Sequence, residues 1–111
     1  MTGALSAERR RGMLRTAMGP DIAAALADPL TQEIMVNPDG ALRLDRLGEG
    51  RIDTGVIMAA DQVERIIRLV ASHARTEVHG EKPIVSAELP PHSETQVGER
   101  FEGVLPPVSL A

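Results

Sequence analysis

The spacing of apolar residues changes along this chain, and the change limits the folds that it can adopt. Between residues 61 and 74, apolar side chains recur every three or four positions, which is typical of a helix with one buried side. Residues 31–54 and 84–105 carry short apolar runs bounded by glycine and proline, a pattern that indicates strands. Both patterns within 111 residues predict one α+β domain, in which helices pack on an antiparallel sheet of about five strands.

The first apolar runs predict a β-hairpin. Ile34 and Val36 recur with a period of two, as do Leu42 and Leu44. The intervening residues 37–40, Asn-Pro-Asp-Gly, supply the turn chemistry. Proline fixes φ at the first central position, and glycine tolerates a left-handed backbone.

Two helices are expected before this hairpin. The first runs from about residue 5 to residue 18, where Gly19 ends it. Pro20 then opens the second helix, because the first turn of a helix does not need the N–H that proline lacks. Asp28, which precedes a proline, ends the second helix. The buried side of the first helix is expected to comprise Met13, Leu14, Ala17 and Met18.

The most regular apolar stripe predicts a longer helix that begins at Asp61. Asp61 and Glu64 have the spacing of a capping box. Glu64 is also one turn from Arg68, so these two side chains are expected to form an exposed ion pair. The buried stripe is expected to comprise Val63, Ile66, Ile67, Val70, Ala71 and Ala74.

Further strands are expected around residues 51–54, 84–87 and 100–105. Residues near the end of the sequence, such as Val108 and Leu110, are still apolar. We therefore expect the chain to be part of a longer protein in which this packing continues.

Composition narrows the classes of function. The formal net charge of −4 argues against binding nucleic acid through its phosphates, which needs a basic surface. Arg9, Arg10, Arg11 and Arg15 form a local basic cluster that is expected to be a solvated helix face, with contact to anionic lipid or nucleic acid as the alternative. No apolar run has the roughly 18 to 20 residues that span a bilayer, and no signal peptide is recognisable, which predicts a cytoplasmic protein.

The sequence offers no catalytic centre of its own. Lys82 is the only lysine, and it lies between Glu81 and Pro83 rather than in the glycine frame of a phosphate-binding P-loop. ATP hydrolysis by the isolated chain is therefore not expected. The chain has no cysteine, and its histidines, His73, His79 and His92, lack the spacing of a zinc site, so no metal site is expected.

One arginine is a candidate for anion binding. Arg100 opens a predicted strand two residues after Gly98, where a guanidinium can hold a ligand phosphate with two parallel hydrogen bonds. The alternative is a surface arginine at the start of an edge strand.

Three blocks of this sequence resemble the N-terminal domain of the TrbB-type conjugal-transfer ATPases, which belong to the type IV secretion systems. The first block is the helix start at Gly19-Pro20-Asp21 that leads into residues 28–40. The second is the amphipathic helix that precedes His79-Gly80, and the third is the pair of proline-bounded strands in the last quarter. The resemblance covers the chain from Leu14 onward and leaves the first dozen residues without a match.

The resemblance implies a PAS-like module over residues 19–111, preceded by a helical extension over residues 1–18. In this family the nucleotide lies between the N-terminal domain and a RecA-like domain that carries the P-loop, with N-terminal arginines near the phosphates. Arg100 occupies the matching strand. ATP and Mg²⁺ would then be cofactors of the full-length hexamer, and its partners would be other copies of the chain and the secretion machinery at the inner membrane. The alternative is a non-enzymatic PAS-like sensor or adaptor that docks a partner through the strand edge near Phe101 and through residues 106–107.

Overall fold

The computed structural model describes residues 3–91 and 98–107. His92, and the apolar Val108 and Leu110 near the end of the sequence, lie outside these ranges. The elements, in chain order, are α1 (Gly3–Met18), α2 (Pro20–Ala27), β1 (Thr31–Val36), β2 (Ala41–Arg46), β3 (Gly50–Ile57), α3 (Ala60–Ala74), β4 (Ile84–Glu88) and β5 (Arg100–Val104).

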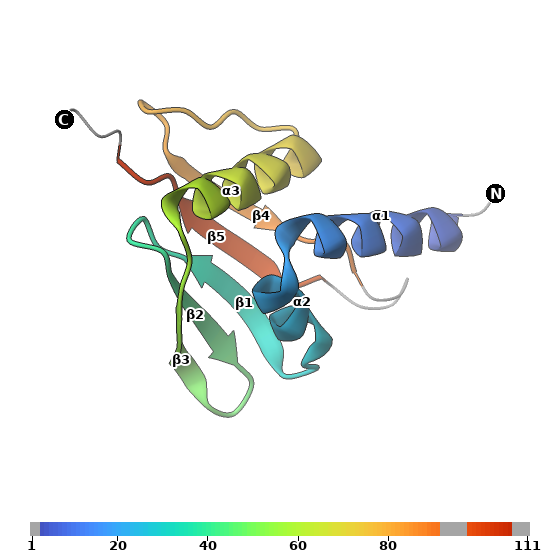
Figure 1. Ribbon diagram of the computed structural model, residues 1–111. Coiled ribbons are helices and arrows are strands. Elements are labelled where there is room, and N and C mark those ends of the chain that lie inside the picture. The colour runs from blue at the N-terminus through green and yellow to red at the C-terminus, as the bar shows by residue number, and fades with distance from the viewer. Residues whose placement is uncertain (1–2, 92–97, 108–111) are drawn as a thin grey trace.

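The five strands form one sheet in the order β3-β2-β1-β5-β4, and the helices cover one of its faces (Figure 1). This arrangement confirms the α+β class and the expected strands. The sheet is not antiparallel throughout, because β1 and β5 run parallel. The hairpin of β1 and β2 is confirmed, and Gly40 in its turn has a φ of +90°. Its amide donates to the Asn37 carbonyl oxygen at 2.9 Å.

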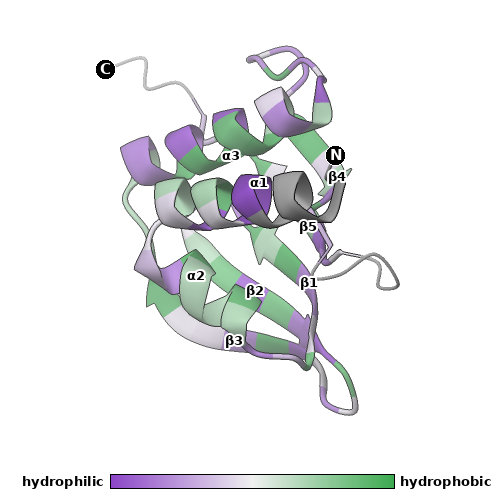
Figure 2. Ribbon diagram, turned by 90° about the vertical axis from the view of Figure 1, so that its right-hand side faces the viewer, coloured by the Kyte–Doolittle hydropathy of each residue, from purple (hydrophilic) through white to green (hydrophobic). Residues whose placement is uncertain are grey.

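The core lies between the helices and the sheet and is built almost entirely from aliphatic side chains. Figure 2 shows α3 with its apolar side toward the sheet and its polar side outward. Phe101, the one aromatic residue of the chain, is 1% exposed and belongs to this core. A Cβ on Gly103 would lie 2.8 Å from both the Ile67 Cγ1 and the Phe101 ring, so β5 and α3 are packed without space for a further methyl group.

The first helix buries a different side from the one predicted. Met18 is buried as expected and Leu14 is half-buried, but Met13 is 66% exposed and Ala17 is also exposed. The stripe that faces the domain instead contains Arg11, Leu14, Arg15 and Met18. These residues have the spacing i, i+3, i+4 and i+7 of one helical face. The error follows from assuming that an arginine would lie in solvent.

The third helix has the predicted phase but not the predicted cap. The first five members of its apolar stripe are buried, whereas Ala74 is exposed. The N-cap residue is Ala59, and it makes no side-chain cap hydrogen bond. The prediction of a capping box was therefore wrong. Asp61 lies inside the first turn, where its carboxylate accepts from the amide of Gln62 at 3.0 Å. Glu64 and Arg68 form the expected exposed ion pair at 2.9 Å.

This helix phase makes a prediction about stability. Ile67 is fully buried, so Ile67→Ala should lower the free energy of unfolding by about 2 to 5 kcal/mol, as large-to-small changes in packed cores do. Arg68→Ala, on the exposed side, should change it by at most about 0.5 kcal/mol. Urea melts of both variants test the difference, and equal losses would show that the side chain of Ile67 contributes no more than the surface pair.

Candidate functional site

Arg100 is the first residue of β5, and its side chain lies on the face of the sheet that no helix covers. The next residue, Phe101, is buried in the core, and successive side chains of a strand point to opposite faces. Arg100 and Glu102 therefore share the helix-free face, and both are exposed. Among the described residues, Arg100 takes part in no salt bridge or side-chain hydrogen bond, although four other arginines in this part of the chain form ion pairs. No described side chain thus holds its guanidinium.

The neighbours of Arg100 on both adjacent strands are carboxylates. In the register of the sheet, Glu33 of β1 is its partner on one side and Glu88 of β4 is its partner on the other. The next pair along β1 and β5, Ile34 and Phe101, lies in the core, so Glu33 and Arg100 share the opposite face. Glu88 pairs with Arg100 across antiparallel strands, where the Cβ atoms of directly opposite residues are about 4.5 to 5.5 Å apart. Glu102 lies on that face two residues further along β5. A phosphate that approached Arg100 would therefore meet negative charge on both sides.

The part of the helix-free face that β2 and β3 form is also charged. Arg43 of β2 pairs with Asp53 of β3, at 3.4 Å between Nη2 and Oδ2. Asp45 and Arg51 are partners in the same two strands. Met35 of β1 lies in register between Arg43 and Glu102 and is buried, at 7% exposure. Opposite charges on adjacent strands stabilise a solvated sheet face, so the charges on β2 and β3 are explained without a ligand.

The two residues before Arg100 have structural roles. A Cβ on Gly98 would lie 1.7 Å from the carbonyl oxygen of Leu89, so glycine is required by the close approach of two backbones. The Leu89 amide donates to the Glu99 carbonyl oxygen at 2.8 Å, which joins the same two segments. The presence of glycine near Arg100 is therefore accounted for by chain packing and is not by itself a sign of phosphate binding.

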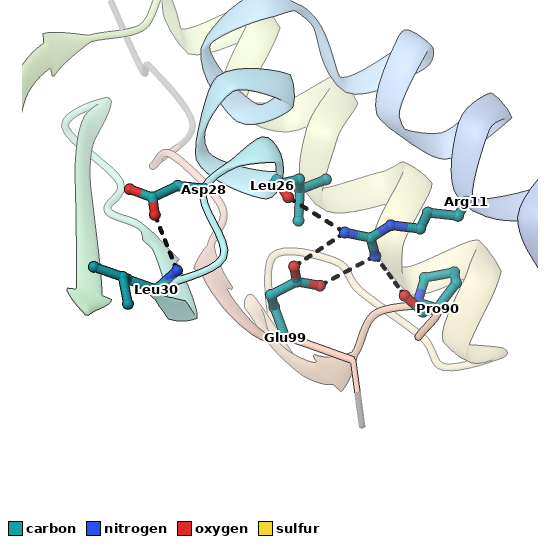
Figure 3. A network of polar contacts seen from close by, with 6 residues as sticks. All are labelled: Arg11, Leu26, Asp28, Leu30, Pro90 and Glu99. Carbon is teal, nitrogen blue, oxygen red and sulfur yellow. Dashed lines mark hydrogen bonds and ion pairs between the residues drawn. The ribbon is translucent and has the colours of Figure 1, made fainter. Parts of the chain in front are cut away.

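Glu99 is buried and forms an ion pair with Arg11 of α1 (Figure 3). Arg11 Nη2 lies 3.0 Å from Glu99 Oε2, and Arg11 Nη1 lies 3.2 Å from Oε1. The guanidinium also donates to the carbonyl oxygens of Leu26 and Pro90. Arg11 is 6% exposed and Glu99 is 5% exposed. Arg11 thus joins α1 to the end of α2 and to the segments on either side of residues 92–97.

This ion pair corrects the interpretation of the N-terminal basic cluster. Arg9 and Arg10 are exposed, as expected for a solvated face, but Arg11 is buried and Arg15 is half-buried. The helical spacing of Arg11 and Met18, seven residues apart on one face, is a signal that could have indicated the burial. Its partner was not predictable, because Glu99 lies 88 positions further along the sequence.

A groove of about 680 Å³ lies at the opposite end of β5 from Arg100. Its lining is mostly apolar and includes Pro38, Pro83, Val104, Leu105, Pro106 and Pro107, together with Glu64 and Arg68 of α3. Arg68 already pairs with Glu64 and donates to the Val78 carbonyl oxygen at 3.4 Å. The groove and Arg100 are therefore separate features of the domain.

Within residues 3–91 and 98–107, no cluster of three or more acidic, histidine or cysteine side chains is arranged to hold a metal ion. The helices in these ranges are also too short or too polar to cross a membrane.

Comparison with known proteins gives two relatives. A probable conjugal transfer protein TrbB from Sinorhizobium fredii is 44% identical over 95 residues, which cover 86% of this chain and 27% of the relative. The conjugal transfer protein TrbB of Rhizobium radiobacter is 40% identical over 108 residues, or 97% of this chain and 32% of the relative. The chain thus spans about three tenths of the length of these relatives. No family model and no solved structure matches it.

The longer match also corrects the extent of the resemblance. An alignment over 97% of a 111-residue chain extends into the first dozen residues, which were expected to have no match. This agrees with the burial of Arg11.

Proposed function

Because the chain is homologous to the conjugal transfer protein TrbB over most of its length, we propose that it is the N-terminal domain of a hexameric conjugal-transfer ATPase. The identity of 40% to 44% over nearly the whole chain is the observation that carries this proposal. The domain contributes to assembly of the ring and closes over ATP and Mg²⁺ held by a P-loop domain elsewhere in the protein. Residues 19–111 form the nucleotide-facing module, and residues 1–18 are its helical extension.

The proposed partners are other copies of the protein and the type IV secretion machinery. The ring works on the cytoplasmic side of the inner membrane as a peripheral component, and its movement as ATP is bound and hydrolysed drives conjugal transfer. The isolated domain has no turnover of its own, since its one lysine is outside any P-loop frame.

Within this function, Arg100 contacts the terminal phosphate of the bound ATP. Its exposure on the helix-free face and its lack of an ion pair among the described residues support the role. A guanidinium is always charged at neutral pH and can hold two phosphate oxygens at once. The flanking carboxylates of Glu33 and Glu88 weaken this contact without preventing it.

The role predicts a specific loss in the full-length protein. Arg100→Ala should raise the dissociation constant for ATP, or lower the rate of hydrolysis, by about 10- to 100-fold, which is the size of a lost hydrogen bond to a charged group. ADP binding should change less, because ADP lacks the γ-phosphate. Equilibrium binding of both nucleotides, with steady-state turnover, measures the effect.

Arg51→Ala is the matched control, since Arg51 is also an exposed arginine in the same sheet and its strand lies at the far edge. Arg100→Ala should leave the free energy of unfolding within about 0.5 kcal/mol of the wild type. A folded variant with wild-type ATP affinity and turnover would rule out the role and leave Arg100 as a surface residue.

An adaptor or PAS-like sensor is the second candidate, and the apolar groove beside Pro106 and Pro107 favours it. The sequence of the gene that encodes this chain distinguishes the two proposed functions. A reading frame that continues into a strand and a GxxxxGK motif supports the ATPase. A stop codon directly after Ala111 supports the adaptor.

A further inference from the structure

We propose that Glu33 and Glu88 are positioning residues that control how strongly Arg100 holds a nucleotide phosphate, an inference that rests on the proposed function. The two carboxylates lower the affinity of Arg100 for the phosphate of a bound nucleotide.

The geometry that supports this inference is the register of the sheet. β5 lies between β1 and β4, so Arg100 has a direct partner on each side. Both partners are glutamates, and no other arginine of the sheet has a carboxylate in register on both sides: Arg43 has Met35 and Asp53, and Arg46 has Thr31 and Gly50. Arg51 has a partner on one side only, since β3 is an edge strand.

The charges act on Arg100 without an ion pair that fixes it. Glu33 is half-buried and Glu88 is exposed, and neither lies within salt-bridge distance of Arg100 in the described structure. Each carboxylate attracts the guanidinium and competes with a phosphate for it, which weakens the contact between arginine and phosphate. At an exposed site such interactions change an equilibrium constant by about 2- to 5-fold per charge and become smaller at high salt.

The experiment uses the full-length protein and the isosteric substitutions Glu33→Gln and Glu88→Gln, each alone and in an Arg100→Ala background. Each substitution should lower the dissociation constant for ATP by about 2- to 5-fold at low ionic strength, with a smaller change for ADP. The gain should decrease at high salt and should disappear when Arg100 is replaced. A purely structural role of the two glutamates would not make the gain in ATP affinity depend on Arg100.

Glu77→Gln is the control for the overall change in charge. Glu77 lies in the segment after α3, outside the sheet, and its side chain is 82% exposed. This variant should leave the dissociation constant for ATP unchanged.

Two outcomes overturn the inference in distinguishable ways. If Arg100→Ala alone leaves ATP binding unchanged, the control by the glutamates fails, and if turnover is also unchanged, the proposed role of Arg100 fails with it. If Arg100→Ala weakens ATP binding but the glutamine variants do not strengthen it, only the proposed control by the glutamates fails. The same holds if the glutamine variants strengthen ATP binding equally with and without Arg100. Urea melts of the glutamine variants confirm that the compared proteins are equally folded.

Discussion

Gly98→Ala is expected to lower the free energy of unfolding by about 4 kcal/mol or more, which belongs to the upper tail of single-substitution effects. The added Cβ would lie 1.7 Å from the carbonyl oxygen of Leu89 and 2.7 Å from its carbonyl carbon. Both atoms belong to the backbone, so no side-chain rotation relieves the overlap. The two segments would have to separate, which also breaks the hydrogen bond from the Leu89 amide to the Glu99 carbonyl oxygen.

A typical domain has a free energy of unfolding of about 5 to 15 kcal/mol, and this loss is a large fraction of it. The variant should therefore melt at a much lower temperature or fail to fold. Gly80→Ala is the matched control, because a Cβ at Gly80 would meet no atom within 4 Å and its backbone needs no positive φ. Circular dichroism during thermal and urea unfolding measures both. Similar stability of the two alanine variants would mean that the close contact between the backbones at Gly98 and Leu89 does not exist in solution.

The second large effect is expected from the buried ion pair of Arg11 and Glu99. Replacing either residue alone by leucine should cost about 3 to 5 kcal/mol, because it leaves the other charge buried without its partner. The double variant Arg11→Leu/Glu99→Leu should be more stable than either single variant, since it removes both charges. It should not regain the full wild-type stability, because the carbonyl oxygens of Leu26 and Pro90 lose the donor that Arg11 provides.

Urea melts of the four proteins form a double-mutant cycle that measures the coupling between the two side chains. Arg10→Leu is the control, since Arg10 is the exposed neighbour of Arg11 in the same helix, and its effect should be within about 0.5 kcal/mol. Additive losses from the two single variants would contradict a buried pair. They would instead restore the view of Arg11 as part of a solvated helix face.

Much of the fold was predictable because it depends on neighbours within a few residues. The turn between β1 and β2 follows from proline and glycine in residues 37–40, and the buried side of α3 follows from a 3.6-residue period. The absence of a P-loop frame around Lys82 is likewise a local property. The position of Arg100 at the start of a strand was predicted from the same kind of pattern and agrees with β5.

Features that join distant segments were decided only by the tertiary structure. The burial of Arg11 depends on Glu99, and the parallel pairing of β1 with β5 brings Glu33 beside Arg100. Hydrophobic periodicity assigns an arginine to solvent, because burying a charge is unfavourable unless a partner satisfies it. Whether such a partner exists depends on how the chain packs, because Arg11 and Glu99 are 88 positions apart in the sequence. The pairing of strands likewise places carboxylates on both sides of Arg100.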